Sequence, residues 1–260
     1  MKSLIIKIYN SFLSDGFFPT IYRCIRFPII RLKTARIRRK IFSLEDTNEI
    51  FQKIYEINWW GSTESISGHG STLNYTKNLR KELPIVFDKF LMHKVFDAPC
   101  GDFNWMSKVI EKTNMQYLGG DIVQELIDNN KTIFSNDRIK FLHTNLINDK
   151  FPEADIWICR DFFIHLSYYD IYKSLFNYAS SSIRYILTTS YINSSGFKNI
   201  DIRTGDGRII DLFSEPFFFP KEYKYKIIDW IEPYSPREMV LFTRDQIIEL
   251  LPRMKKAIKL

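Results

Sequence analysis

Two carboxylates stand at a spacing that could hold the hydroxyls of a ribose. Asp97 ends an apolar, strand-forming stretch and is followed by a turn that contains Gly101, and Asp121 ends the next such stretch. In the nucleotide-binding half of a doubly wound sheet, an acid about 20 residues past the glycine turn accepts both ribose hydroxyls. Asp121 suits that role, because ligands bind outside the carboxyl ends of parallel strands.

The glycine turn does not carry the pattern of a dinucleotide site. That pattern needs three glycines, and here Asp102 and Asn104 occupy places where glycine would let a pyrophosphate approach. One glycine and two acids instead suit a ligand that lacks phosphate and carries a positive charge. S-adenosylmethionine (SAM), with its sulfonium, amino group and ribose, is such a ligand.

A candidate catalytic pair lies further along the chain. Asp161 ends a strand-forming stretch over residues 155–161, and His165 follows it. A hydroxyl nucleophile needs a base, and an imidazole with an unperturbed pKa near 6.5 suits that task. Asp161 could orient the imidazole or act as the base itself. His165 could instead be a helix-cap or core residue, and Asp161 an acid at a helix N-terminus. No second histidine or carboxylate has metal-ligand spacing nearby, so no metal is expected.

The elements that would position these residues alternate as in an α/β protein. Strands are expected to lead to Asp97 and over residues 116–121, 139–146, 155–161 and 182–191, with helices over residues 105–110 and 168–178 and directly after residue 121. A helix over residues 73–91 would be kinked or broken at Pro84. Residues 226–232 and 238–243 would form a final strand hairpin.

Two irregular stretches could contact ligands. Residues 59–72 place small, hydroxyl and glycine residues after paired tryptophans, and such a segment can wrap a ligand with backbone N–H groups or remain a plain surface loop. Residues 192–222 are long enough to be functional. This second loop could reach over the site with Asn199, Asp201, Arg203 and Asp206 as acceptor contacts, or it could cover a sheet edge.

Three segments in the same order resemble class I SAM-dependent methyltransferases. Residues 97–105 resemble the first motif in its D-x-P-C-G-x-x-x-W variant, and residues 159–166 keep C-R-D-x-x-x-H-L. Residues 60–72 are similar to the segment W-G-S-x-E-S-x-S-G-x-G-S-T that precedes the first motif and lies over the cofactor in that family. Together the resemblance covers residues 50–245.

The resemblance implies SAM as cofactor and a set of residues that bind it. Ile122 would lie against the ribose or adenine. Asn145 departs from the acid that many members have at its position, and its carbonyl oxygen would accept from the adenine amino group. The full cofactor-binding set is Ser67, Gly68, Ser71, Asp97, Ala98, Pro99, Gly101, Trp105, Asp121, Ile122, Asn145, Leu146, Arg160 and Asp161.

The implied fold is a Rossmann-like class I methyltransferase sheet, mostly parallel with a C-terminal antiparallel hairpin. It would occupy residues 46–260 and follow a basic, apolar helical extension over residues 1–45. The implied reaction is methyl transfer to an oxygen of a small acceptor. Such proteins accompany bacterial surface-polysaccharide enzymes, which suggests a sugar, phosphate or phosphoramidate group of a capsule or other surface glycan.

Charge is concentrated at the start of the chain. Residues 1–40 hold 10 of the 37 basic residues and one of the 30 acidic ones, so the net charge of +7 belongs to this arm and the rest is slightly acidic. A nucleic-acid groove across the body is therefore disfavoured. The arm could pack on the body or on a second subunit, contact an anionic membrane surface, or contact nucleic acid. The oligomeric state is left open.

Three cysteines without a C-x-x-C pair argue against a disulfide framework and favour a reducing cytoplasm. Membrane contact through the basic arm would place the protein at the inner face of the membrane. Neither a secretion signal nor a membrane span is expected. Two other functions remain alternatives. One is a non-catalytic Rossmann-like protein that binds a partner through its basic arm. The other is a nucleotide-dependent oxidoreductase, which the missing glycines disfavour.

Overall fold

The computed structural model describes residues 35–41 and 43–260. The chain divides into two units, residues 1–45 and residues 46–260. In the first unit, residues 35–41 are helical, and the Ser43 hydroxyl donates a hydrogen bond of 2.8 Å to the Lys40 carbonyl. Most of the basic arm, residues 1–34, lies outside the described residues, and so does most of the membrane contact predicted for it.

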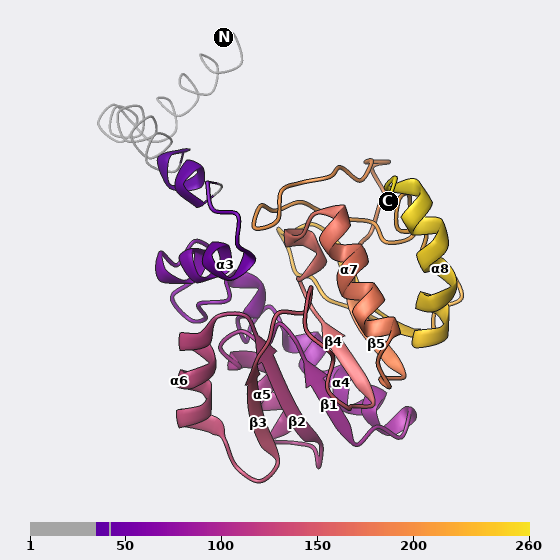
Figure 1. The fold of residues 1–260 in the computed structure, drawn as a ribbon. Coiled ribbons are helices and arrows are strands. Elements are labelled where there is room, and N and C mark those ends of the chain that lie inside the picture. Colours follow the sequence, from indigo (N-terminus) through magenta and orange to yellow (C-terminus); the bar gives the residue numbers. More distant parts are fainter. Residues whose placement is uncertain (1–34, 42) are drawn as a thin grey trace, which may run out of the picture. The chain divides into compact units, whose positions relative to one another are not determined.

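The second unit is built on a seven-stranded sheet with the strand order β3-β2-β1-β4-β5-β7-β6 (Figure 1). The parallel strands are β1 (Lys94–Asp97), β2 (Gln116–Asp121), β3 (Ile139–His143), β4 (Ile156–Cys159) and β5 (Tyr185–Tyr191). The strand β7 (Arg237–Thr243) runs antiparallel to both β5 and β6 (Tyr225–Ile228). The predicted mostly parallel sheet with a C-terminal antiparallel hairpin is confirmed.

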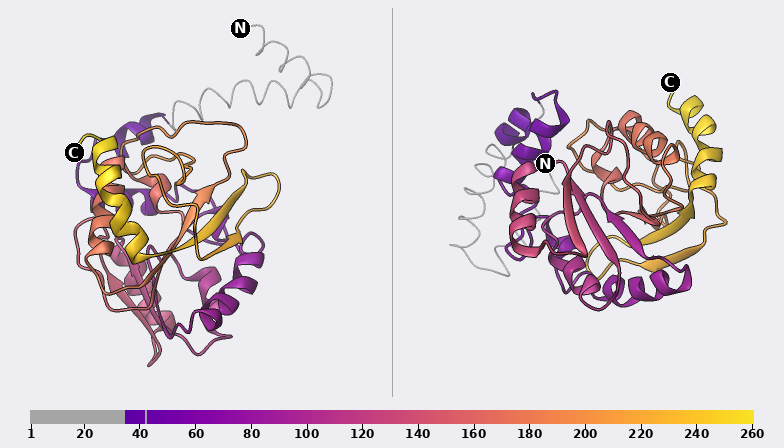
Figure 2. Two further views of the ribbon diagram at one scale, coloured as in Figure 1. Left: turned by 90° about the vertical axis from the view of Figure 1, so that its right-hand side faces the viewer. Right: turned by 60° about the horizontal axis from the view of Figure 1, so that its bottom comes forward.

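Helices cover both faces of this sheet (Figures 1 and 2). The helices α4 (Lys77–Lys89), α5 (Asn104–Ile110) and α6 (Gln124–Phe134) share one apolar core with β1 and β2. The helices α7 (Tyr168–Ala179) and α8 (Arg244–Ala257) pack together on the other face. The helix α3 (Thr47–Glu56) begins at Asp46, whose carboxylate accepts the backbone N–H groups of Asn48 and Glu49.

Some element boundaries differ from those predicted. The third strand ends at His143 and not at residue 146, because the Asn145 N–H bonds the Asp149 carboxylate at 2.7 Å and the chain turns. The fourth strand ends at Cys159, and Asp161 has a left-handed backbone with φ of +54°. The helix α4 continues through Pro84, because Leu83 and Val86 are buried in the core on either side of it.

The ends of β1 and β2 rest on a compact aromatic layer. The Phe103 ring lies 4.5 Å from the Tyr117 ring and 5.3 Å from the Phe141 ring, measured between centroids. Gly119 leaves room for this layer, since a Cβ there would lie 2.7 Å from the Phe141 ring. This packing fixes the height at which Asp97 and Asp121 emerge from the sheet.

Candidate active site

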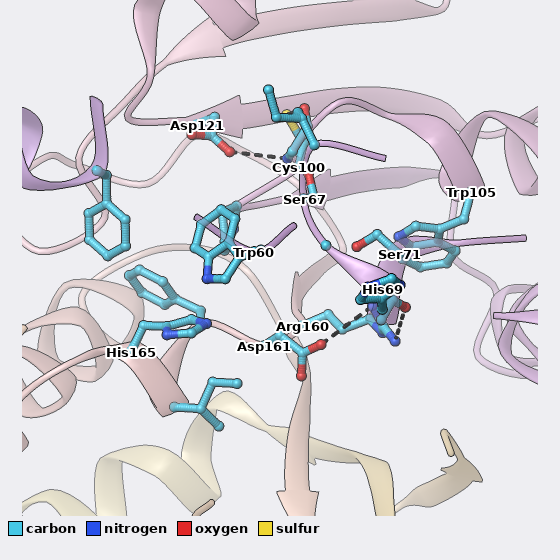
Figure 3. Close-up of a pocket in the computed structure, with 18 of the residues that line it drawn as sticks. Trp60, Ser67, His69, Ser71, Cys100, Trp105, Asp121, Arg160, Asp161 and His165 are labelled. Carbon is cyan, nitrogen blue, oxygen red and sulfur yellow. Dashed lines mark hydrogen bonds and ion pairs between the residues drawn. The ribbon is translucent and has the colours of Figure 1, made fainter. Parts of the chain in front are cut away.

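The carboxyl ends of the parallel strands surround a cavity of about 410 Å³ (Figure 3). Most of the residues predicted to bind the cofactor or to act in catalysis line it. They are Ser67, Gly68, Ser71, Asp97, Pro99, Gly101, Trp105, Asp121, Ile122, Arg160, Asp161 and His165. Three segments far apart in the chain therefore meet in one cavity, as the position of ligands at the carboxyl edge of such sheets requires.

The glycine turn after β1 and the acid at the end of β2 are directly bonded. The Gly101 N–H donates to one Asp121 carboxylate oxygen at 3.0 Å, and the Val123 N–H donates to the other at 3.1 Å. Burial raises the pKa of Asp121, and these backbone bonds oppose the rise. The carboxylate is thus fixed in orientation, and each of its oxygens keeps a further lone pair for a ligand.

Asp97 is held differently, inside the base of the cavity. The side chain is almost fully buried and accepts a hydrogen bond of 2.8 Å from the Tyr117 hydroxyl. Burial raises the pKa of Asp97 to about 7, although the Tyr117 hydroxyl and the nearby Arg160 lower it. Asp97 can therefore change its protonation state near neutral pH.

Residues 60–71, called the strap below, form one wall of the cavity. The Asp102 carboxylate accepts the Ser65 hydroxyl and the Ile66 N–H, each at 3.0 Å. The Ser67 hydroxyl in turn accepts the Asp102 N–H at 3.2 Å. Asp102, which occupies a glycine position of the dinucleotide pattern, is thus the anchor of the strap.

Gly101 is required where the strap meets the turn. It has φ of +55°, and a Cβ at this position would lie 2.1 Å from Ser67 Oγ and 3.0 Å from Ser67 Cβ. A side chain at residue 101 would force the strap away from the cavity.

The remaining predicted cofactor residues lie beside or beneath this cavity. Asn145 and Leu146 line a small neighbouring cavity of about 20 Å³ that shares Pro99, Asp121 and Ile122 with the first. The side-chain carbonyl oxygen of Asn145, predicted to accept from adenine, accepts the Ile147 N–H at 3.0 Å. Ala98 is fully buried and lines neither cavity; its carbonyl accepts the Trp157 indole N–H at 2.7 Å.

Two arginines and two aspartates form an ion-pair network in the cavity wall. Arg160 donates to Asp229 through Nε at 2.9 Å and to the Gly70 carbonyl through Nη2 at 2.8 Å. Arg237 donates to Asp161 through Nη1 at 2.7 Å and to the Asp229 carbonyl through Nε at 2.8 Å. Burial acts to raise the pKa of Asp161, but the two arginines outweigh it and hold this pKa below its ordinary value.

His165 faces the cavity with one ring nitrogen already bonded. Its Nδ1 lies 2.8 Å from the Asp206 carbonyl oxygen. A carbonyl only accepts, so Nδ1 carries the proton and Nε2 keeps its lone pair. Burial lowers the pKa of His165, although the Asp206 carbonyl and Asp161 raise it. The Trp60 ring of the strap lies 5.5 Å from the imidazole between centroids (Figure 3). Together these features keep the imidazole neutral and ready to accept a proton.

The prediction that Asp161 orients His165 does not match this geometry. Asp161 bonds Arg237 and Thr189, and His165 is oriented by a backbone carbonyl of the loop over residues 192–224. Two of the other polar residues predicted in this loop act within it or on the start of α7. Asn199 donates to the carbonyls of Asp211 and Glu215, and Asp201 accepts the Tyr168 N–H. Among the residues that line the cavity, none comes from this loop.

Sequence reasoning missed one side of the site. Arg237 lines the cavity, and Asp229 lies behind it. Both belong to the hairpin, where the strand pattern was evident but the polar residues were not assigned a role. An arginine at the start of an otherwise apolar strand, as in residues 237–243, was the available signal.

Two further kinds of feature are absent from residues 35–41 and 43–260. In this part of the chain, groups of three or more histidine, cysteine, aspartate or glutamate side chains that could hold a metal ion do not occur. Nor does any helix within these residues have the length and apolar character needed to cross a membrane.

Comparisons with known proteins identify the fold. No protein-family model matches the chain, and no curated protein sequence matches it either. Solved structures do match. A SAM-dependent methyltransferase from Leishmania major is 12% identical with a TM-score of 0.58, over 76% of this chain and 87% of that one. Magnesium protoporphyrin IX methyltransferase from Synechocystis PCC 6803, with bound SAH, is 14% identical with a TM-score of 0.54, over 76% and 97%.

Human N-acetylserotonin methyltransferase in complex with SAM is 14% identical with a TM-score of 0.51, over 80% of this chain. The match spans only 64% of the human chain. At these identities the likeness concerns the fold. The second unit therefore has the Rossmann-like fold of the SAM-dependent class I methyltransferases.

Proposed function

We propose that this protein transfers a methyl group from SAM to an oxygen of a small acceptor. The observation that carries the proposal is the bond between Gly101 and Asp121 in a turn whose next residue, Asp102, is an acid that anchors the strap. This arrangement offers a fixed carboxylate to a ribose. It does not suit a pyrophosphate, because an acid stands where the dinucleotide pattern has a glycine. The fold is shared with structures that hold SAM or SAH.

The residues of the cavity fit this cofactor. Asp121 would accept the ribose hydroxyls, and Ile122 with the neighbouring Asn145 and Leu146 would enclose the adenine. Ser67, Gly68 and Ser71 of the strap, with Gly101 and Trp105, would hold the methionine end. When bound, the cofactor supplies a methyl group on a positively charged sulfur, and acids such as Asp97 and Asp121 favour that charge.

His165 would accept the proton of the acceptor hydroxyl. The acceptor oxygen would take the methyl group that the bound cofactor supplies, and the proton that this oxygen loses would pass to Nε2 of His165. Its neutral form and its fixed Nδ1–H tautomer both suit this role. The Trp60 ring beside the imidazole would help to exclude water from the reacting atoms.

The identity of the acceptor is a finer part of this proposal. A sugar, phosphate or phosphoramidate group of a bacterial capsule or other surface glycan is supported by the resemblance of residues 97–105 and 159–166 to enzymes found with such pathways. A cytoplasmic protein whose basic residues 1–40 touch an anionic membrane surface would meet a membrane-assembled acceptor.

Calorimetric titration with SAM, S-adenosylhomocysteine (SAH) and NAD tests the cofactor. We expect micromolar binding of SAM and SAH, weakened at least tenfold in Asp121→Asn because hydrogen bonds to a charged group contribute about 1.5–3 kcal/mol each. Asp128→Asn is the matched control, because Asp128 is an exposed carboxylate on α6 that pairs with Gln124. This variant should bind SAM and SAH with unchanged affinity. Binding of NAD alone would overturn the proposal.

A further inference from the structure

The cavity has a second polar end, away from Asp121. Asp121 ends β2, whereas Arg237 begins β7, four positions along the strand order. With neighbouring strands about 4.8 Å apart, the two residues stand roughly 19 Å apart along the sheet. Because β7 is antiparallel, its first residue pairs with Tyr191, the last residue of β5. Arg237 therefore reaches the same edge as the carboxyl ends of the parallel strands, on the side of the cavity opposite the predicted ribose site.

Arg237 has a buried donor at this end that no described residue satisfies, and Arg160 lies beside it in the same ion-pair network. Both arginines are at least nine-tenths buried, and both line the cavity. Arg160 Nη1 has only a 3.5 Å contact with Asp161. Arg237 Nη2 makes an ion contact of 3.4 Å with Asp229 but no hydrogen bond to any described residue. Buried guanidinium donors without acceptors cost free energy, so their presence calls for a partner that carries oxygen acceptors.

Hydroxyl groups surround the two arginines. Tyr75, Tyr191, Tyr234 and Ser235 line the same end of the cavity. The Tyr75 ring lies 4.8 Å from the Arg237 guanidinium carbon and 5.8 Å from that of Arg160, which fixes both groups. Burial raises the pKa of Tyr75 to about 12 and also raises that of Tyr191. These phenols stay protonated and can donate hydrogen bonds at neutral pH.

We propose that Arg160 and Arg237, with Tyr75, Tyr191, Tyr234 and Ser235, form an anion subsite that binds a carboxylate or phosphate group of the acceptor. Guanidinium forks match the oxygens of both groups. The position of Arg237 on β7 favours the acceptor over the cofactor as the source of the anion, because Asp121 and Ile122 place the adenosine part toward β2. Arg160 lies nearer the cofactor, with its guanidinium carbon 5.4 Å from the Trp105 ring that would hold the methionine end. His165 follows β4, between these two ends. This inference rests on the proposed methyl transfer and adds that the acceptor is anionic.

The test is calorimetric titration of the SAH-saturated protein with inorganic phosphate and methyl phosphate at constant ionic strength. We expect binding with millimolar dissociation constants that adds to SAH binding and does not compete with it. Arg237→Lys keeps the charge but loses the fork, and should weaken phosphate binding about tenfold with unchanged SAH affinity. Arg138→Lys is the matched control, since Arg138 is a partly buried arginine that bonds the Thr113 carbonyl at the opposite edge of the sheet.

Three results separate the possibilities. If the wild-type protein with SAH bound does not bind phosphate, the subsite is overturned. This result needs no variant, so it does not depend on whether a variant folds. If phosphate displaces SAH, and Arg237→Lys weakens SAH but not 5′-methylthioadenosine, the arginines hold the cofactor carboxylate and the acceptor assignment fails. If SAH does not bind at all, the proposed function fails, while phosphate binding to the free protein that Arg237→Lys weakens still supports an anion site.

Discussion

Arg237 Nη1 and Asp161 Oδ1 lie 2.7 Å apart, although 76 positions of sequence separate the two residues. The contact joins the segment after β4 to the start of β7, across the carboxyl end of β5, which lies between them in the sheet. It also keeps Asp161 charged and occupied, since the neighbouring arginines hold its pKa below the ordinary value against the effect of burial. Asp161 is therefore engaged with Arg237, and the proposed function assigns the proton-accepting role to His165.

Replacing His165 should separate chemistry from binding. We expect His165→Ala to lower kcat by roughly 10²–10⁴ with a nearly unchanged dissociation constant for SAH, the range typical of a lost general base. In the wild type, kcat/KM should fall as the pH drops through the pKa of His165, which burial places below 6.5, and should be flat above it. Measurement of kcat/KM against pH checks both points.

Asp161→Asn is the control for this assignment. It removes the partner of Arg237 but leaves the imidazole and its Asp206 bond, so the acid limb of the pH profile should remain even where activity falls. Loss of that limb in Asp161→Asn, or full turnover with the natural acceptor in His165→Ala, would contradict a base role for His165.

Gly101→Ala should release the strap. The substitution adds a left-handed backbone cost of about 1–2 kcal/mol and a Cβ that would overlap Ser67 Oγ. We expect a lower melting temperature and at least tenfold weaker SAH binding. Gly196→Ala is the matched control, because Gly196 also has positive φ, at +70°, but no atom lies within 4 Å of the added Cβ. Equal effects of the two substitutions on SAH binding would argue against a clash with the strap.

Asp102→Ala should loosen the strap. The substitution removes the acceptor of the Ile66 N–H and the Ser65 hydroxyl. Hydrogen exchange of the strap amides should become at least tenfold faster, because a bond to a charged acceptor contributes about 1.5–3 kcal/mol. Asp155→Ala removes a carboxylate that accepts the His93 and Lys94 N–H groups elsewhere, and should leave strap exchange unchanged. Unchanged strap exchange in Asp102→Ala would mean that other contacts hold this segment.

Asp97 should make stability depend on pH. Its pKa is raised by burial to about 7 in the folded state, from 3.8 ordinarily. The folded protein therefore retains a proton that the unfolded chain loses, and the stabilisation is complete below pH 3.8 and lost as the pH rises through 7. The loss amounts to at most about 4 kcal/mol. In Asp97→Asn this contribution should vanish, so urea unfolding of both proteins at pH 5 and pH 8 measures the difference. An equal decrease in both proteins would assign the pH dependence to other groups.

The parallel part of the fold followed from the sequence, and so did the gathering of most of the predicted cofactor residues around one cavity. Strand-forming stretches that end in Asp97, Asp121 and Asp161 fix which residues reach the carboxyl edge, because strand direction alone determines this. The strap was evident from glycine and serine residues that have no role in a core.

What the sequence did not reveal depends on contacts between distant elements. Arg237 joins the site only because β7 inserts antiparallel between β5 and β6, a pairing that no local pattern encodes. His165 takes its orientation from a carbonyl, and every residue has one, so composition gives no signal for Asp206. The bond from the Ile147 N–H to the Asn145 side-chain oxygen is likewise a property of the turn and not of the residue type.

The place of β7 in the strand order has a consequence for biosynthesis. The strand β6 precedes β7 in the chain, and among the described strands it pairs with β7 alone, so it cannot join the sheet until β7 has been translated. Until then β5 is an unprotected edge strand whose backbone groups can pair with another nascent chain. A chain released before residue 237 would expose this edge and lack Arg237 as well. The strand β7 thus both covers the edge of β5 and supplies Arg237 to the cavity.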